Sequence, residues 1–256
     1  MSDNLLRNML FNLERTTLYY VVIAGVFFLL WSWWRARPGQ RRPLQTKKVE
    51  APQIRRELLV SVGSVAVFSS FLPILFLLGL GQYTHFYPRI AEYGWPYFFL
   101  SILLAMIIQD TYFYWTHRLM HHRRLFRWFH RTHHRSTNTN PWSTYSLNPL
   151  EAIVDSGSGV LILLILPITG WALIIFTTIN TIYAVYTHLG YELFPRSMSR
   201  HWLGRWINTS TAHNLHHAKA RYNFSWYFLF WDRMMGTLSP DYDEHYRKAG
   251  FRADPG

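Results

Sequence analysis

The chain has 256 residues, of which 50% are hydrophobic, 18% are aromatic and only 16% are charged. Soluble domains carry about 25% charged residues, so this composition excludes most soluble proteins and favours a membrane protein. The chain contains no cysteine, which excludes disulfides, iron–sulfur clusters, thiolate-ligated haem and cysteine nucleophiles. Its net charge of +12 fits either a nucleic-acid partner or an anionic membrane surface until the basic residues are placed.

Four long stretches with almost no charge are the predicted membrane segments. A helix needs about 20 apolar residues to cross a bilayer, with a range of roughly 17–25. The first three stretches fit single helices, whereas the fourth is too long for one, so we expect a hairpin broken at Pro167–Gly170. In chain order the stretches are Leu18–Trp34, Leu58–Leu80, Trp95–Thr116 and Ser156–Tyr191. The predicted fold is an all-α integral membrane protein with about four to five membrane helices, including the hairpin, and a cytoplasmic helical cap that carries histidines.

The basic residues flank these segments instead of forming a separate block. Residues 35–56 hold eight Lys or Arg against one Glu, and such loops stay in the cytoplasm under the positive-inside rule. This places the N-terminus and residues 81–94 outside, and the basic residues 117–135 in the cytoplasm. The hairpin then returns His188 and the basic C-terminal part to the cytoplasmic side. We expect a multi-pass protein of a bacterial inner membrane, or of the endoplasmic reticulum if eukaryotic, and no nucleic-acid partner.

The chain divides into three predicted parts. Residues 1–94 form an N-terminal two-span membrane region with a basic loop, residues 95–240 form the catalytic part, and residues 241–256 form a polar tail. Within the catalytic part, residues 117–150 are expected to be largely helical. They close with turns, because "NTNPWSTYSLNP" is rich in Asn and Pro.

Thirteen histidines are present, and eleven of them lie between residues 117 and 217. One group has the spacing i, i+4, and two groups have the spacing i, i+3, i+4, so each group can aim its imidazoles at one point from one helix face. Neutral imidazole suits Zn, Cu, Fe and Ni, and eight imidazoles exceed what one ion needs, which indicates two metals. The eight are His117, His121, His130, His133, His134, His213, His216 and His217. A solvated helix surface would explain one such pair, but a metal site explains all three groups better.

The missing acidic residues narrow the kind of metal site. Zinc peptidases use H-E-x-x-H with Glu as the general base, and here Arg118 stands where that Glu would be. Carboxylate-rich di-iron bundles use Glu-x-x-His pairs, and none of the three groups contains Asp or Glu. An all-nitrogen ligand set fits oxygen activation better than hydrolysis, although a zinc hydrolase and a metal transporter or regulator stay open. A transporter should hold its ligands near the membrane midplane, whereas these groups lie beyond the span ends.

Three segments, "DTYFYWTHRLMHH", "WFHRTHH" and "TSTAHNLHHAKARYNFSWYFLFWDRMMGT", resemble the signature boxes of the fatty acid hydroxylase/sterol desaturase superfamily. The third box resembles the sterol C5-desaturase branch. The resemblance implies a membrane enzyme with a histidine-ligated di-iron centre, in which zinc could replace iron in a purified sample. Such enzymes use O2 and electrons from an external haem or iron–sulfur carrier to hydroxylate or desaturate lipid C–H bonds. The eight histidines match the family's ligands, and His188 in "THLGYE" matches a ninth.

Acidic residues near the boxes are candidates for supporting roles. Asp110 lies near the helix face of the first two histidines, so it could accept a hydrogen bond from a ligand's free N–H, and we include it with the catalytic residues. It could instead be an Asp at the membrane interface, solvated or paired with Arg. Glu151 and Asp155 could support a ligand or cap the hairpin's first helix, and capping is the expected role of Glu151. Asp232 is expected to form an ion pair with Arg233.

The remaining four histidines are not expected to bind metal. His122 should face solvent or lipid head groups, because it points about 100° away from His121 on a helix. The other three are His85, His201 and His245. Aromatic residues of the third span could line a lipid route to the metals or could simply pack: Trp95, Phe98, Phe99, Phe113 and Trp115.

The sequence thus predicts an O2-dependent lipid desaturase or hydroxylase with two iron ions. The alternatives are a fatty-acyl or sphingolipid hydroxylase of the same superfamily and, from another class, a membrane zinc-binding protein or transporter. Sterols, fatty acyl chains, sphingoid bases, carotenoids and alkyl-glycerols all fit a hydrophobic channel, so the substrate stays open, as does the oligomeric state.

Overall fold

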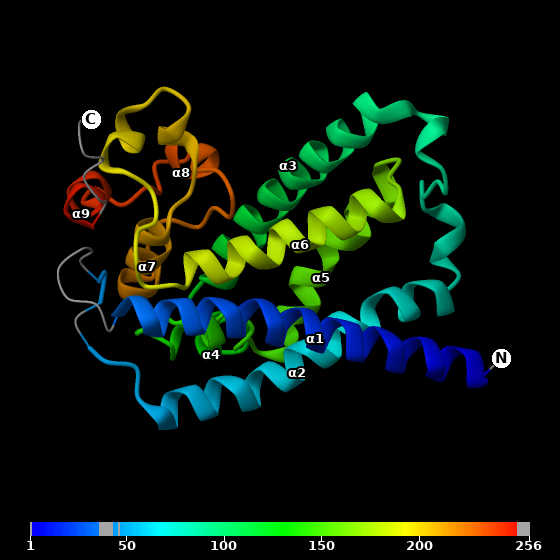
Figure 1. Ribbon diagram of the computed structural model, residues 1–256, viewed down its shortest axis with the longest axis horizontal. Coiled ribbons are helices and arrows are strands. Elements are labelled where there is room, and N and C mark those ends of the chain that lie inside the picture. The colour runs from blue at the N-terminus through cyan, green and yellow to red at the C-terminus, as the bar shows by residue number, and fades with distance from the viewer. Residues whose placement is uncertain (1, 36–42, 46, 250–256) are drawn as a thin grey trace.

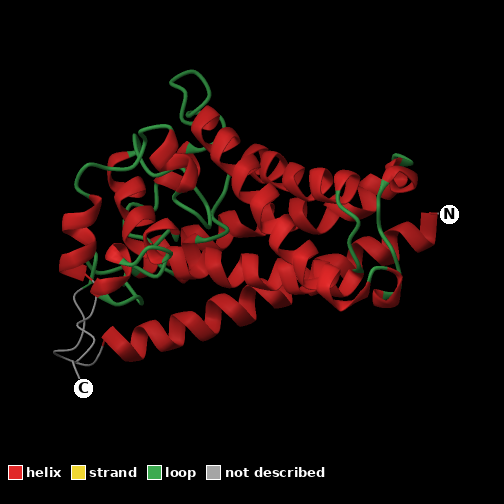
Figure 2. Cartoon of the chain, turned by 90° about the horizontal axis from the view of Figure 1, so that it is seen from above, coloured by secondary structure: helices red, strands yellow, loops and turns green. Residues whose placement is uncertain are grey.

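Long helices dominate the computed structural model, which describes residues 2–35, 43–45 and 47–249 (Figures 1 and 2). Four of them are long and apolar enough to cross a membrane: residues Leu10–Trp33 of α1 (Ser2–Arg35), α2 (Ala51–Leu77), α3 (Gly94–Met120) and α6 (Gly170–Thr187). A fifth, α5 (Pro149–Ile165), has 17 residues and lies directly before α6. The predicted all-α membrane architecture with a hairpin is therefore confirmed.

Local sequence signals set the hairpin. The Asn148 side chain accepts a hydrogen bond from the Leu150 backbone N–H at 2.9 Å and begins α5, with Pro149 at the first helical position. The chain leaves the helix after Ile165, and the Thr169 side chain begins α6 by accepting from the Ala172 N–H at 3.1 Å. The break therefore falls at the expected Pro167–Gly170 segment.

Short helices and turns make up the rest of the described chain. The expected helical segment over residues 117–150 is wrong, because α3 ends at Met120 and turns follow up to the single helical turn of α4. A continuous helix would separate residues 121 and 134 by about 20 Å, so the reversal is what brings the first two histidine groups together. The short elements are α4 (Arg131–His134), α7 (Ser210–Lys219), α8 (Phe230–Met234), α9 (Tyr242–Ala249) and the 3-10 turns Leu80–Tyr83, Ile90–Glu92, Pro141–Ser143, Arg196–Arg200 and Gly204–Trp206.

The short helices gather at one end of the long ones. In Figure 1, α7, α8 and α9 lie at the left, where α1 ends and α2 begins, while the N-terminus and the α2–α3 connection lie at the right. At the right-hand end, the Tyr87 N–H donates to the Ile168 carbonyl at 3.2 Å and ties this connection to the hairpin turn. The ends of α3 and α6 that carry histidines thus point to the same end of the bundle, as the hairpin predicted.

Close helix packing builds the core away from the histidines. Side chains of α2, α3, α5, α6 and the turn between α5 and α6 form its largest cluster: Leu75, Phe98, Ile102, Ala105, Ile162, Leu163, Leu166, Ile168, Ala172 and Phe176. Gly157 lets α3 approach α5, because a Cβ there would collide with the Tyr112 hydroxyl, which donates to the Val154 carbonyl at 2.8 Å. Small residues allow such contacts between membrane helices, and this one sets the position of α5 beside α3.

Candidate metal centre

The first histidine group lies at the end of α3. His117 stands on its last turn and is 1% exposed, and His121 is the residue that ends the helix. Because they are four residues apart on one helix end, both rings point to the same side. His122 is exposed, as expected.

The second group stands on and before the short helix α4. His130 precedes the helix, and His133 lies within it; they are 2% and 4% exposed. The loop that follows is anchored to α2 by Glu57, whose carboxylate accepts from Asn140 Nδ2 at 2.7 Å and from Gln53 Nε2 at 2.8 Å. This anchoring holds the second group against the helix ends.

The third group lies on α7, and the ninth histidine directly follows α6. His213, His216 and His217 are 3%, 0% and 3% exposed, and His188 is 1% exposed. The start of α7 is held by Glu192, whose carboxylate accepts from the N–H and the hydroxyl of Thr211 at 3.1 and 2.7 Å. Sequence reasoning missed Glu192, although it stands in the motif "THLGYE" beside His188.

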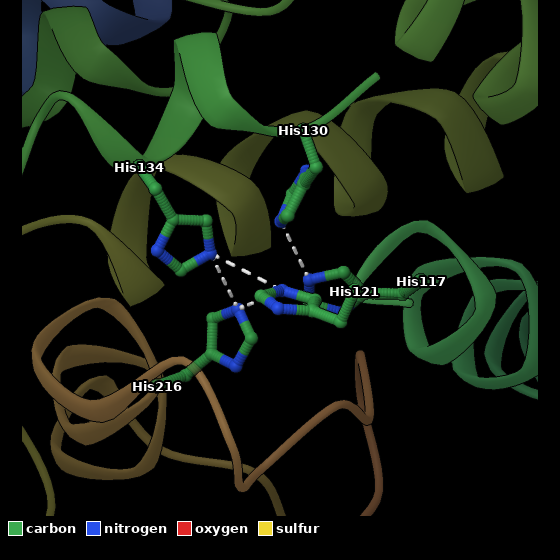
Figure 3. A group of neighbouring side chains, drawn as sticks. All are labelled: His117, His121, His130, His134 and His216. Atoms are coloured by element: carbon green, nitrogen blue, oxygen red, sulfur yellow. Dashed lines mark hydrogen bonds between the residues drawn. The ribbon is translucent and has the colours of Figure 1, made fainter. Parts of the chain in front are cut away.

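Five imidazoles converge on one point (Figure 3). The five-histidine cluster consists of His117, His121, His130, His134 and His216. The Nε2 atoms of His117 and His130 lie 2.9 Å apart, and those of His121 and His216 lie 3.1 Å apart. His134 Nε2 lies 3.2 Å from His121 Nε2 and 3.0 Å from His216 Nε2.

The other four imidazoles converge on a second point. The four-histidine cluster consists of His133, His188, His213 and His217. His188 Nε2 lies 3.3 Å from His133 Nε2 and 3.0 Å from His213 Nε2. His217 Nε2 lies 3.1 Å from His213 Nε2. In each cluster the ligand atoms all lie within 4.8 Å of one another, so the structure brings all nine predicted histidines together.

The clusters divide both i, i+3, i+4 groups, so the expectation that each group aims at one point is wrong for these two and right for His117 and His121. In each i, i+3, i+4 group, the first and last residues are about 40° apart around the helix, and the middle residue is about 100° from the last. His130 and His134 therefore stay together while His133 joins the other cluster. In the same way, His213 and His217 stay together while His216 crosses over. Each of these two groups thus contributes to both clusters and links them.

The spacing of the nitrogens fits metal coordination. Imidazole nitrogens bind zinc at about 2.0–2.1 Å, which separates neighbouring donors by about 3.3 Å in a tetrahedron and about 2.9 Å in an octahedron. The Nε2 separations reported above, from 2.9 to 3.3 Å, match this range. An all-imidazole set suits iron, zinc, copper or nickel, so each cluster could hold one such ion.

Burial keeps these rings in the neutral form that binds metal. Desolvation lowers the pKa of His188 and of His134 to about 4. Desolvation, together with the neighbouring His117, lowers the pKa of His121 to about 2. Because these values lie well below the usual 6.5, the rings offer lone pairs and not charges at neutral pH.

Backbone carbonyls orient several of the rings. The Nδ1–H of His117 faces the Phe224 carbonyl at 2.9 Å, and that of His216 faces the Tyr222 carbonyl at 2.7 Å. His188 Nδ1 lies 2.8 Å from a carbonyl one turn earlier in α6. A hydrogen bond at Nδ1 selects the tautomer whose Nε2 carries the lone pair and fixes the ring's direction. The Nε2 atoms are therefore aimed at the cluster centres.

A carboxylate orients a further ring. His130 Nδ1 lies 2.5 Å from Oε1 of Glu151, and both side chains are buried. The expected capping role of Glu151 is wrong, because Asn148 caps α5 and Glu151 faces the five-histidine cluster. A carboxylate behind a metal-ligating imidazole raises the basicity of the ring.

Comparisons with known proteins agree with this site. The sequence pattern of the fatty acid hydroxylase family matches residues 102–237, just over half of the chain. The chain belongs to the fatty acid hydroxylase family. A Delta(7)-sterol 5(6)-desaturase of Gibberella zeae is 27% identical, over 72% of this chain and 56% of the relative. A Delta(7)-sterol 5(6)-desaturase of Aspergillus fumigatus is also 27% identical, over 72% of this chain and 62% of the relative. The lathosterol oxidase of Homo sapiens is also 27% identical, over 73% of this chain and 61% of the relative.

These relatives support the sterol-desaturase branch of the predicted superfamily. The chain spans about three fifths of the length of the relatives named here. No solved structure matches the chain.

Asp110 has a different role in this family member from the one expected. It is 3% exposed, and its Oδ1 accepts from the backbone N–H groups of Trp226, Tyr227 and Phe228 at 3.2, 2.6 and 3.0 Å. The expected hydrogen bond to a ligand is wrong, because seven helical residues place Asp110 about 10 Å from His117 along α3. Asp110 instead holds the segment that supplies carbonyls to the rings.

Asp232 supports the same segment from the other side. Its two carboxylate oxygens accept from the backbone N–H groups of Phe224 and Ser225, each at 2.9 Å. The expected ion pair with Arg233 is wrong, because Arg233 Nε donates to the Arg205 carbonyl at 3.1 Å instead. Both aspartates therefore hold the backbone of residues 224–228 in place, and Phe224 of this segment supplies the carbonyl that faces His117.

A cavity of about 380 Å³ leads from both clusters into the helix bundle. Its inner end includes five of the nine histidines: His117, His130, His133, His188 and His213. Its wall includes Phe68, Phe71, Leu72, Leu173 and Phe176 of the membrane helices, and it reaches Arg15 and Tyr19 of α1. Exposed residues of α1 and α6, among them Arg15 and Ile174, line its outer part, so the cavity opens between these helices.

Of the five aromatic residues of α3 that could either line a lipid route or pack, four do not line this cavity. Phe113 does, because it lies four residues before His117 on the inner face of α3. Phe98 packs in the apolar core, and Trp95, Phe99 and Trp115 are 60%, 62% and 45% exposed on the outside of α3. Of the two alternatives, the lipid route therefore fits only Phe113 and packing or an outward position fits the other four, because only one face of α3 meets the cavity.

Proposed function

We propose that the protein is an O2-dependent lipid oxidoreductase that holds two iron ions in its histidine clusters and desaturates or hydroxylates a C–H bond of a sterol or related lipid. Electrons would come from an external haem or iron–sulfur carrier. The observation that carries this proposal is that both clusters open onto one cavity between membrane helices. The relatives are named as Delta(7)-sterol 5(6)-desaturases and a lathosterol oxidase, which supports a sterol as the substrate.

Hydroxylation and desaturation use the same reactants. With one O2, two electrons and two protons, hydroxylation yields an alcohol and one water. Desaturation removes two hydrogens from neighbouring carbons and yields an alkene and two waters. The chemistry that bound iron would supply is the activation of O2 for this oxidation.

The residues of the chain position the reactants. Nine imidazoles would hold the two ions, and Glu151 would keep His130 in the tautomer that points Nε2 inward. A lipid entering between α1 and α6 would lie along the apolar side chains of Phe113 and Phe176. These side chains exclude water, which protects the reaction from side reactions.

We further propose that the histidine end faces the cytoplasm. The end of α1 and the start of α2 lie at this end, and the basic residues 35–56 fall at and between them in the sequence. Exposed arginines of the turn between α3 and α4, Arg123, Arg124 and Arg127, add to the positive charge there. Basic loops are retained in the cytoplasm, and an electron carrier would reach the clusters from that side.

The test combines metal content with product analysis. Protein produced with ample iron should contain about two irons per chain, because the imidazoles form two clusters that suit iron. Supplied with a reductant and lathosterol, it should form an alkene or alcohol under O2 and none without O2. His133→Ala should abolish the product, and His122→Ala should not. One metal or none in folded protein, or product formed without O2, would refute the proposal.

A further inference from the structure

Two carboxyl groups of α5 face the cavity beside the clusters. Glu151 and Asp155 are four residues apart, so they share one face of the helix, and both line the cavity. Glu151 is 2% exposed and engages His130 through Oε1. Its second oxygen, Oε2, and Oδ1 of Asp155 are buried and accept no hydrogen bond from any residue that the structure describes.

Neighbouring hydroxyl groups of the cavity wall already have partners. Ser156, Ser158 and Thr181 each donate their hydroxyl to a backbone carbonyl of their own helix, at 2.7 to 3.0 Å. These hydroxyl hydrogens are therefore used within their own helices and are not available to the carboxyl oxygens. Leaving a buried acceptor without a donor is costly, so the two open oxygens indicate a donor that arrives with a ligand.

The position of the pair sets where such a ligand would be oxidised. Asp155 lies about 6 Å further along α5 than Glu151, by the rise of four helical residues. Glu151 in turn contacts His130 of the five-histidine cluster. If a donor group of a ligand is bound at Asp155, the ligand carbons a few bonds from that group lie at the inner end of the cavity.

We propose that Glu151 and Asp155 form an anchor for the hydroxyl group of the lipid substrate. The proposal rests on the proposed function and adds to it the residues that would recognise the hydroxyl group of the sterol or of another neutral lipid alcohol. A carboxyl group can accept a hydrogen bond from a hydroxyl or donate one to it. A free fatty acid is excluded, because its carboxylate would meet two further carboxyl groups.

The test measures equilibrium binding, so it does not depend on turnover. Radiolabelled lathosterol and its 3-deoxy analogue are bound to iron-loaded protein in lipid nanodiscs. The wild type should prefer the sterol by about 10- to 100-fold, the range for a hydrogen bond to a carboxylate. Asp155→Leu should abolish this preference by weakening only the binding of lathosterol, and Asp155→Asn should retain part of the preference. Asp243→Asn, an exposed residue of α9, is the matched control and should keep the full preference.

Each outcome supports or overturns the anchor. Equal binding of the two ligands by the wild type, or an equal loss of both in Asp155→Leu, would overturn it, because a water-filled or purely structural carboxyl pair gives that result. If Asp155→Leu does not retain its metals, Asp155→Asn decides the question alone. Hydroxyl preference without O2-dependent product would refute the oxidase proposal only, and product formation without hydroxyl preference would refute the anchor only.

Discussion

Replacing His188 by Ala should remove one metal and leave the other. His188 belongs to the four-histidine cluster, where its Nε2 lies 3.3 Å from that of His133 and 3.0 Å from that of His213. Without it, this cluster keeps only three imidazoles, whereas the five-histidine cluster keeps its full set. The two clusters should therefore respond differently to a single substitution.

The size of the effect follows from what a ligand contributes. Loss of a residue that hydrogen-bonds to a metal-ligating side chain lowers metal affinity about 10- to 100-fold. Loss of the ligating side chain itself should therefore lower the affinity at least about 100-fold, or about 2.8 kcal/mol. At a free metal concentration of about ten times the wild-type Kd, occupancy of this cluster should fall from about 90% to about 10%. Total metal should then fall from about two to about one per chain.

Elemental analysis after equilibrium dialysis against a metal buffer measures this directly. His121→Ala removes one of five imidazoles and leaves four, so its metal content should stay closer to two per chain. His122→Ala, an exposed neighbour, should match the wild type. Two tightly held metals in His188→Ala would show that His188 is not a ligand. Loss of both metals from folded His188→Ala would show that the two clusters are not separate centres.

Four further predictions concern the surroundings of the clusters. Glu151→Gln should weaken metal binding about 10- to 100-fold at the five-histidine cluster, which chelator competition measures; unchanged affinity would contradict its role. The metal-free protein should lose stability as pH falls from about 6.5 to about 4, by about 1.4 kcal/mol per pH unit for each buried imidazole such as His188. The reason is that the pKa of His188 is lowered to about 4 in the folded protein, so the unfolded chain takes up protons first. Equal melting temperatures at pH 7 and pH 4.5 in detergent would refute this. Asp110→Ala should lower the free energy of unfolding by at least about 1–3 kcal/mol, because three backbone N–H groups lose their acceptor, and Asp110→Asn should lower it less in thermal unfolding; equal losses would argue against this role. Because the chain has no cysteine, a membrane-impermeant thiol reagent outside intact cells should label Tyr83→Cys and not His122→Cys, and the reverse pattern would place the histidine end outside.

Resemblance to a family motif supplied His188, whereas the membrane helices, the hairpin and the other eight metal-binding candidates could be predicted from the residues alone. Each of these rests on a local pattern. Uncharged runs of sufficient length mark the spans, Pro167 marks the hairpin turn, and histidines three and four residues apart mark metal-binding faces. Such patterns are set by the geometry of one helix and need no knowledge of its neighbours.

The division of the nine imidazoles into clusters of five and four follows from how the helices pack and not from any local pattern. The rotation of α4 and α7 relative to α3 selects which ring of each group crosses to the other cluster, and no local spacing records that rotation. The carboxylate contacts are also long-range: Glu151 meets His130 across 21 residues, and Asp110 meets Tyr227 across 117. A helix cap and a ligand partner look alike in sequence, because both are an acidic residue near a helix start, and only the packing of α5 against the second histidine group separates them.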